Sequence, residues 1–177
     1  MRLGESMLDR EVRIEPLEEQ HREPLRQACA EDPEMWSIYP MSFLGERFDA
    51  SFEACFGNAS ILPFALFDGE RLVGMSSYFV DAANMALEIG RTYISPRMRG
   101  TNFNKRVKRL MLDRAFDQGF RRVQFQIDTR NTRSMAAVEK LGAVREGTLR
   151  QNRVTWTGFV RDTAVYSILA DEWHGRE

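Results

Sequence analysis

The residues best suited to chemistry lie in one stretch, Glu88 to Phe116. Residues 87–94 alternate as a strand would, and Pro96 ends that strand because proline has no backbone N–H to donate. A short polar loop follows, and a helix pattern begins at Phe103. A helix N-terminus behind a glycine-containing loop presents free N–H groups, and the helix dipole adds to their attraction for anions. The sequence therefore predicts an anion-binding site at this loop.

Basic side chains gather around the same loop. Six of them fall in a window without a single acid: Arg97, Arg99, Lys105, Arg106, Lys108 and Arg109. The whole chain has a formal net charge of −1, so this excess is local. Basic residues in a first helical turn also oppose the helix dipole, a cost that a bound phosphate would offset. We therefore favour a phosphate site over the alternative, a solvated basic helix face.

The loop also carries a family pattern. Arg97-x-x-Gly100-x-Asn102 resembles the Q/R-x-x-G-x-G/A acetyl-CoA motif of the GNAT acyltransferases, although Asn102 stands where that motif has glycine or alanine. Arg99-Gly100-Thr101 with Asn104 resembles the form found in the RimJ/RimL branch, the ribosomal-protein N-terminal acetyltransferases. Further matches follow in order: Asn131-x-x-Ser134, Leu141-Gly142-Ala143 and Glu146-Gly147. The resemblance covers the chain from about residue 10 onward.

The resemblance implies acetyl-CoA as the cofactor. Backbone N–H groups from Arg99 to Asn104, including those of Gly100, Thr101 and Asn102, would hold its pyrophosphate, with Arg97 adding charge. A backbone N–H near Tyr93 or Ile94 would stabilise the oxyanion, and Asn131 would bind the pantetheine amide. Capping of a helix is the alternative for Asn131. The family fold further implies two neighbouring strands that splay apart in a V and admit the pantetheine arm.

The order of the expected elements predicts the fold class. Strands are expected at 12–14, 61–67, 71–80, 87–94, 123–127, 144–153 and 163–169, and helices at 17–30, 44–56, 103–116 and 131–141. This order predicts an α+β, or mixed α/β, fold: a mostly antiparallel twisted sheet of about seven strands flanked by about four helices. The 177 residues suit a single domain, with 1–10 as an N-terminal extension that need not be ordered.

Composition indicates the class of the protein, its location and its partners. The chain is 43% hydrophobic and 29% charged, as in soluble globular proteins. It has no membrane-span pattern and no signal-peptide pattern. Cys29 and Cys55 lack metal-ligand spacing, so we expect free buried thiols, no metal and a cytoplasmic protein. His21 and His174 are expected on the surface. Aromatic residues do not alternate with the basic cluster, so no nucleic-acid partner is expected, and a homodimer is left open.

Acetyl transfer to an amine needs a group that takes a proton and a group that returns one. The resemblance points to Glu88 as the base, because GNAT enzymes often use a carboxylate on this strand; an ion pair with an arginine is the alternative. Many members use a tyrosine as the acid, but Val138 stands in its place. Ser134 matches the residue proposed for this role in the N-terminal acetyltransferase branch, and helix capping is its alternative.

The acceptor pocket would come from loops and a protruding hairpin, with Trp36, Tyr39 and Trp156 as candidates; core packing is the alternative for each. Arg153 lies where branch members can carry an acid. The sequence thus predicts an acetyl-CoA-dependent N-acetyltransferase acting on a primary amine, which is a protein N-terminus, a lysine or a small molecule. The alternative is a degenerate, CoA-binding sensor of the same family.

Overall fold

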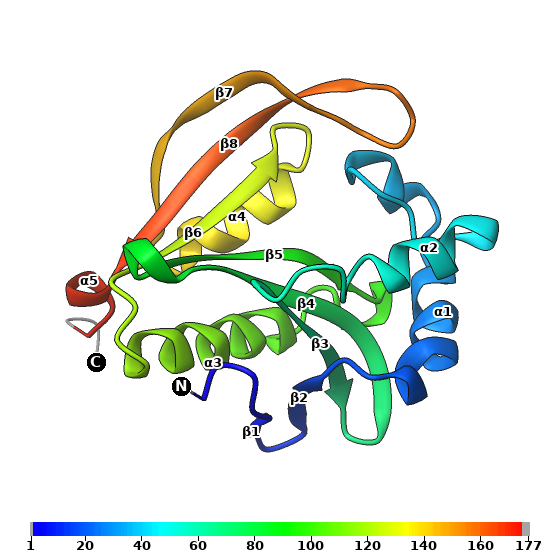
Figure 1. The fold of residues 1–177 in the computed structure, drawn as a ribbon, viewed down its shortest axis with the longest axis horizontal. Helices are drawn as coiled ribbons and strands as arrows, with labels where there is room; N and C mark the ends of the chain where they lie inside the picture. The colour runs from blue at the N-terminus through cyan, green and yellow to red at the C-terminus, as the bar shows by residue number, and fades with distance from the viewer. Residues whose placement is uncertain (1, 175–177) are drawn as a thin grey trace.

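The computed structural model describes residues 2–174, which form one open sheet of eight strands (Figure 1). The strands are β1 (Met7–Asp9), β2 (Val12–Pro16), β3 (Ile61–Asp68), β4 (Arg71–Asp81), β5 (Ala86–Ile94), β6 (Arg122–Asp128), β7 (Val144–Val154) and β8 (Val160–Leu169). Their spatial order is β1-β2-β3-β4-β5-β6-β8-β7. Only the β5–β6 pair is parallel among these described strands. The predicted fold class is confirmed, with one strand more than expected.

Five α-helices accompany the sheet in the described part of the chain: α1 (Arg22–Ala30), α2 (Phe48–Glu53), α3 (Phe103–Asp117), α4 (Thr132–Lys140) and α5 (Ala170–His174). Helix α3 joins β5 to β6, since parallel neighbours need a crossover connection. The two N-terminal helices are shorter than the sequence pattern predicted. Each begins with a 3₁₀ turn, η1 (Glu19–His21) before α1 and η3 (Gly45–Arg47) before α2.

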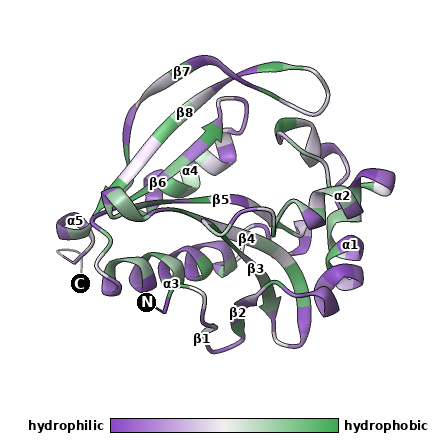
Figure 2. Ribbon diagram, viewed as in Figure 1, coloured by the Kyte–Doolittle hydropathy of each residue, from purple (hydrophilic) through white to green (hydrophobic). Residues whose placement is uncertain are grey.

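Both faces of the sheet are covered. One apolar cluster joins Leu87, Ile89 and Phe125 of the central strands to α3 and α4. A second cluster, on the opposite face, joins Met75 and Tyr93 to α1, α2 and the 3₁₀ segment η2 (Glu34–Ile38) between them. Figure 2 shows hydrophobic residues along the strands between the helices, while the helices themselves carry both colours. The central strands are therefore held on both sides.

The first ten residues differ from the expectation. The sequence left residues 1–10 as an extension that need not be ordered; in the structure β1 pairs with β2, and Leu3 and Met7 are buried in the core. Arg114 of α3 also donates to the backbone carbonyl of Arg2. Apolar side chains at the start of the chain thus supply the eighth strand and its packing against α3, while Met1 lies outside the described residues.

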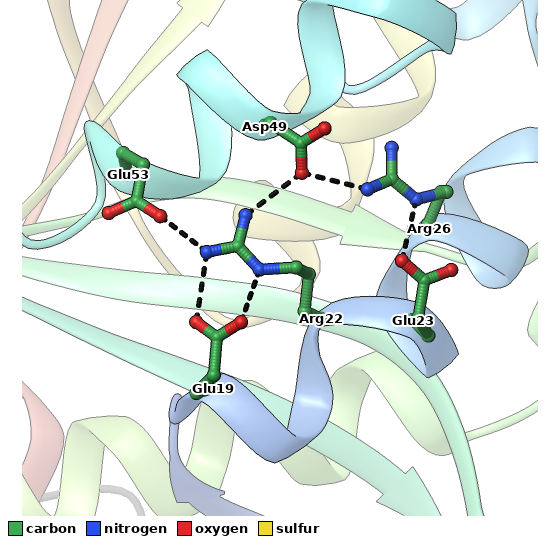
Figure 3. A network of polar contacts seen from close by, with 6 residues as sticks. All are labelled: Glu19, Arg22, Glu23, Arg26, Asp49 and Glu53. Carbon is green, nitrogen blue, oxygen red and sulfur yellow. Dashed lines mark hydrogen bonds and ion pairs between the residues drawn. The ribbon is translucent and has the colours of Figure 1, made fainter.

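An ion-pair network joins α1 to α2 (Figure 3). Arg22 bonds Glu19, Asp49 and Glu53, and Arg26 bonds Glu23 and Asp49. The carboxylates are exposed, so solvent screens these pairs and they add little stability. Their geometry instead fixes how α2 sits on α1.

His21, at the start of α1, is buried rather than on the surface. Its Nδ1 accepts a hydrogen bond from the backbone N–H of Glu18 at 3.0 Å. Cys29 and Cys55 are buried free thiols. Among residues 2–174 no helix has the length and apolar character to cross a membrane.

Candidate active site

The loop before α3 has the backbone geometry of an anion site. Pro96–Met98 forms a 3₁₀ turn, and Gly100 adopts a φ of +74°, which favours glycine. Asn102, at the N-cap position of α3, has a φ of −78°, so the motif's glycine is not needed there for a positive φ. Its side chain caps nothing. Within the described chain, the N–H groups of Gly100, Asn102, Asn104 and Lys105 find no acceptor and are free for a ligand.

Thr101 and Asn104 complete this loop. The Thr101 hydroxyl donates to the carbonyl of Met98 at 2.7 Å and accepts the N–H of Phe103 at 3.2 Å, which fixes the turn. The side-chain Oδ1 of Asn104 is buried and has no hydrogen-bond partner in the described chain. A buried amide group without a partner is costly unless a ligand completes it. The free N–H groups of the loop therefore fit the phosphate end of a cofactor such as coenzyme A, and the Asn104 Oδ1 would accept from an N–H or O–H group of the same ligand.

The arginines of the loop are not free, which the sequence did not predict. Arg97 donates to Glu31 with Nη2 at 2.8 Å, and Arg99 pairs with Asp32. Both acids follow the C-terminus of α1. Arg106 pairs with Asp9 near the N-terminus. The basic window is thus neither a bare phosphate cluster nor a solvated face, because several of its members bind the acidic first part of the chain.

The sheet separates beside this loop. The parallel pairing of β5 and β6 consists of Ala86–Arg122, Leu87–Val123 and Glu88–Gln124, and it ends there although both strands continue. Beyond Glu88, β5 has no partner on its β6 side in the described sheet. The V-shaped splay expected from the family is therefore present, and it exposes backbone groups of β5 toward Ile94.

A β-bulge lies at the mouth of the splay. Residues Arg91 and Thr92 together stand opposite Ser76 of β4, and Arg91 has a φ of +49°. The bulge reverses the alternation of side chains, so Ile89 packs toward α3 while Tyr93 packs on the opposite face. The simple alternation predicted for this strand is wrong from Arg91 onward. The Tyr93 hydroxyl donates to Ala28 O on the other face, so only the backbone of Tyr93 is available in the opening between β5 and β6.

Glu88 occupies the last paired position of β5. Burial raises the pKa of its carboxyl, while a hydrogen bond from Gln124 and the charges of nearby arginines act in the other direction. No ion pair within 4.0 Å involves Glu88 in the described chain, so the ion-pair alternative is not realised. A desolvated carboxylate with a raised pKa at the apex of the splay has the properties of a general base.

Lys108 is the functional candidate that sequence reasoning missed. It is 6% exposed and reaches from α3 to the Thr92 hydroxyl, with Nζ also 5.8 Å from the centre of the Phe125 ring. Thr92 and Phe125 lie on β5 and β6 just past the point where they separate. Burial lowers the pKa of Lys108 to about 7, against the opposing effect of Glu88. The signal was its place beside Val107 and Met111 on the buried side of the helix.

The start of α4 borders β6. The Oδ1 of Asn131 accepts the backbone N–H of Ser134 at 3.1 Å, so Asn131 caps the helix, and Ser134 does not. The hydroxyl of Ser134 donates to no described residue. Val138, which replaces the usual tyrosine, is buried in the core. The arrangement therefore leaves Ser134 as the free hydroxyl of this helix.

The three aromatic candidates for the acceptor pocket separate into different roles. Trp36 is fully buried, donates to Cys29 O at 3.0 Å and stacks on Tyr93, so it is a core residue and not a pocket wall. Tyr39 donates from its hydroxyl to Thr92 O at 2.6 Å, next to the bulge. Trp156 is 37% exposed on the β7–β8 hairpin and donates to Trp36 O at 2.8 Å.

The hairpin and η2 form one side of the acceptor region. In Figure 1 the β7–β8 hairpin arches over β6 and α4, and its turn approaches the segment around η2. An open pocket of about 540 Å³ lies between this turn and the segment that precedes α2, lined by Ser42, Leu44, Gly45, Glu46, Arg47 and Trp156. Trp156 thus lines this pocket, whereas Tyr39 lies beside the bulge of β5.

A sheet that parts between two parallel strands, beside free amides at a helix N-terminus, is the site of a protein that binds a long phosphate-bearing cofactor. The family model for the acetyltransferase (GNAT) domain matches residues 11–144, so the chain belongs to the GNAT acetyltransferase family. The family uses acetyl-CoA as its cofactor and transfers the acetyl group to an amine. The chain is accordingly an acyltransferase. No curated protein matches it in sequence.

Solved structures agree with this membership. A candidate acetyltransferase of T. thermophilus is 36% identical, with a TM-score of 0.88 over 97% of this chain and 92% of that one. A GCN5-related N-acetyltransferase of Brucella melitensis is 29% identical, with a TM-score of 0.89 over 97% of this chain and 81% of that one. RimJ of Mycobacterium smegmatis, solved with CoA-disulfide, is 20% identical, with a TM-score of 0.78 over 91% and 83%, and shares the fold.

Proposed function

We propose that this acetyltransferase acts on a primary amine by direct transfer, with Glu88 as the base. The observation that carries the proposal is the position of Glu88, a partly buried carboxylate at the last residue pair before β5 and β6 separate. An amine placed at this apex lies beside the carboxylate that takes its proton. A protein N-terminal amine, with a pKa near 8, asks less of that base than a lysine near 10.4.

Other residues take supporting roles in this proposal. The free N–H groups of Gly100, Asn102, Asn104 and Lys105 hold the pyrophosphate, and Thr101 fixes the turn. Acetyl-CoA supplies the activated acetyl group as a thioester. A backbone N–H of Tyr93 or Ile94, on the unpaired side of β5, stabilises the negative charge that develops on the acetyl oxygen. The Ser134 hydroxyl returns a proton to the leaving sulfur, and the Nδ2 of Asn131 binds the pantetheine amide.

The family branch, the cellular location and the oligomeric state of the protein are part of the same proposal. The Arg99-Gly100-Thr101 and Asn131-x-x-Ser134 motifs support the RimJ/RimL-like branch. Two buried free thiols support a cytoplasmic location. A homodimer is compatible with the exposed β7 edge of the sheet.

The alternative function is a CoA-binding sensor, and one observation favours it: the family's catalytic tyrosine is replaced by Val138, which lies in the core. The two functions differ in turnover. A sensor binds acetyl-CoA and acetylates nothing, whereas the proposed enzyme acetylates some members of an amine panel. Mass spectrometry of the amines and the rate of CoA release measure this directly.

Glu88→Gln tests the role of the base. We expect kcat near pH 7 to fall about 100-fold, which is within the range for loss of a general base, while acetyl-CoA affinity stays constant. The wild-type rate should rise with pH as Glu88 loses its proton, and this step should vanish in the variant. Glu70→Gln, an exposed change in the β3–β4 turn, serves as the control. A variant with the wild-type pH profile would remove Glu88 from the chemistry.

A further inference from the structure

Two arginines face each other at the end of the β7–β8 hairpin. Arg153 of β7 is the cross-strand partner of Arg161 of β8. Like charges directly opposite each other in a sheet are destabilising unless something offsets them. Arg161 is 5% exposed, and burial, followed by the charge of Arg153, lowers its pKa. The structure keeps this costly pair beside the proposed acceptor region.

Neither arginine has a carboxylate partner in the described chain. Arg153 donates to the side-chain oxygen of Gln126 at 3.0 Å. Arg161 donates from Nε to the Thr163 hydroxyl at 3.2 Å and from Nη1 to Ile38 O at 3.2 Å. Its Nη2 makes no hydrogen bond to any described residue and is not sealed from solvent. Each guanidinium is thus positioned by neutral groups while its charge stays unmatched.

The nearby carboxylates do not balance the charge. Asp128 is taken by Arg130, whose Nη2 donates to it at 2.7 Å. Two described carboxylates, Asp128 and Glu88, act on the charge of Arg161. Because Asp128 is paired with Arg130, Glu88 is the one of these two without an ion-pair partner, and the charges of Arg153 and Arg161 act on it in turn. Arg161 is buried while Arg153 is exposed, and the buried cation gains most from an anion that arrives in the right geometry.

The arginine pair and Glu88 lie on one face of β6. Gln124 bonds Glu88, and Gln126 bonds Arg153. Residues two apart in a strand share a face and lie roughly 6.6 Å apart. Phe125, between them, points into the core on the other face. The two polar groups of a ligand bound at both sites would therefore lie along this face of β6.

Beyond the arginines, the hairpin is hydrogen-bonded to the segment that follows α1. Trp156 donates to Trp36 O at 2.8 Å, and the Trp156 backbone N–H reaches Tyr39 O at 3.4 Å. Arg161 adds its bond to Ile38 O. These contacts join the hairpin to η2 beside Arg161, so an acceptor held by the arginine pair lies next to a fixed part of the chain. This arrangement favours a small acceptor over a peptide.

We infer that Arg153 and Arg161 bind an anionic group of the acceptor, which is therefore a small primary amine bearing a carboxylate or a phosphate. This inference rests on the proposed acetyl transfer at Glu88. The amine end lies at Glu88, and the anionic end lies between the two guanidinium groups, whose fork geometry suits both carboxylate and phosphate oxygens.

The experiment compares amines in matched pairs. One pair is an α-amino acid and its carboxamide, and the other is phosphoethanolamine and ethanolamine. The kcat/KM for acetylation, at low salt and saturating acetyl-CoA, is measured for wild type, Arg153→Gln, Arg161→Lys and Arg150→Gln. Arg150 is an exposed arginine on the same strand and is the control. Isothermal calorimetry of each amine with the wild type and with Arg153→Gln gives binding without reference to turnover.

We expect the anionic member of at least one pair to react with a kcat/KM at least 10-fold higher. Arg153→Gln should remove most of this preference through KM, Arg161→Lys should reduce it, and Arg150→Gln should leave it unchanged. The pair in which the anionic member exceeds the neutral member by the larger ratio of kcat/KM shows whether the arginines prefer a carboxylate or a phosphate. Neutral members acetylated as well as anionic ones, or an equal loss for both in Arg153→Gln, overturn the inference and leave the acetyltransferase intact.

Binding separates the inference from the proposed function. Anion-dependent binding that Arg153→Gln abolishes, with no acetylation of any amine, supports the arginine site and overturns the proposed role of Glu88 in turnover. Absence of both binding and turnover for every anionic amine overturns the inference itself. Acetylation of peptide N-termini in preference to all four small amines overturns it as well.

Discussion

The ammonium nitrogen of Lys108 lies 2.7 Å from the hydroxyl oxygen of Thr92, across the space between α3 and β5. The same hydroxyl lies 2.8 Å from that of Ser76 on β4, so three elements meet at this polar contact. The bulge in β5 places Thr92 there, because without it the side chain would point to the other face. A buried cation and a strained strand thus stand together at the opening between β5 and β6.

Lys108→Met should make the protein more stable at pH 7. In the folded protein the pKa of Lys108 is lowered from 10.5 to about 7, so between these values the unfolded chain binds the proton more tightly. The free energy of unfolding of the wild type should therefore rise with pH from about 7, and this contribution is lost as pH falls through about 7. The variant should lack the rise and gain a few kcal/mol at pH 7.

Urea unfolding at several pH values between about 7 and 9.5 measures this difference, since the window lies between the folded and unfolded pKa values of the lysine. Buried tyrosines with raised pKa values, such as Tyr78, lower stability at still higher pH, but they do so equally in the wild type and the variant. Lys105→Met, an exposed change on the same helix, is the matched control and should follow the wild type. If the Lys108 variant keeps the full rise, the proton is not bound at Lys108.

Local signals were enough to predict much of the fold. Asp68-Gly69 marks the β3–β4 turn, Gly119 ends α3 with a φ of +84°, and Thr157-Gly158 forms the hairpin turn, as the sequence indicated. Each of these turns depends on a few neighbouring residues, so the local sequence is enough to predict it. The same holds for the loop at Gly100.

Features that depend on distant partners were missed. The bulge at Arg91 arises from the register of β5 against β4, and it reverses the faces that simple alternation assigned to Tyr93. Arg97 looked like a free phosphate ligand because Glu31 is 66 positions away in the chain. Trp36 looked like a pocket residue because its burial depends on Tyr93, which lies far along the sequence.

Gly100→Asp should weaken acetyl-CoA binding at least 10-fold. A side chain at this position meets no described atom within 4 Å, so a carboxylate fits, but it stands against the proposed phosphate site. Gly100→Ala shares the backbone strain of a φ of +74°, about 1 kcal/mol, without the charge, and should change affinity only a few-fold. Calorimetry with acetyl-CoA compares them.

The control for charge alone is Gly69→Asp, in another left-handed turn with open space around it. It should leave acetyl-CoA affinity at the wild-type value. Equal affinities for Gly100→Asp and Gly100→Ala would place the phosphates away from this loop.

Asn104→Ala should separate ligand binding from stability. The Oδ1 of Asn104 is buried without a partner among the described residues, so its removal loses no hydrogen bond there, and alanine favours the helix. We expect the thermal midpoint to stay constant or rise, while the dissociation constant for acetyl-CoA increases several-fold. Differential scanning calorimetry and titration calorimetry provide the two values. A lower midpoint with unchanged affinity would mean that Asn104 serves the fold alone.

Ser134→Ala and Asn131→Ala together distinguish chemistry from helix capping at α4. The cap bond runs from the Ser134 backbone N–H to the Asn131 side chain, so Ser134→Ala keeps it and Asn131→Ala loses it, at a cost of about 1 kcal/mol. We expect Ser134→Ala to retain the wild-type thermal midpoint and amine KM but to lower kcat about 10-fold or more, because its hydroxyl no longer returns the proton. Steady-state kinetics with a good acceptor, alongside thermal denaturation of both variants, give the comparison. An undiminished kcat in Ser134→Ala would exclude its hydroxyl as the acid and leave Asn131 and Ser134 as parts of a cap.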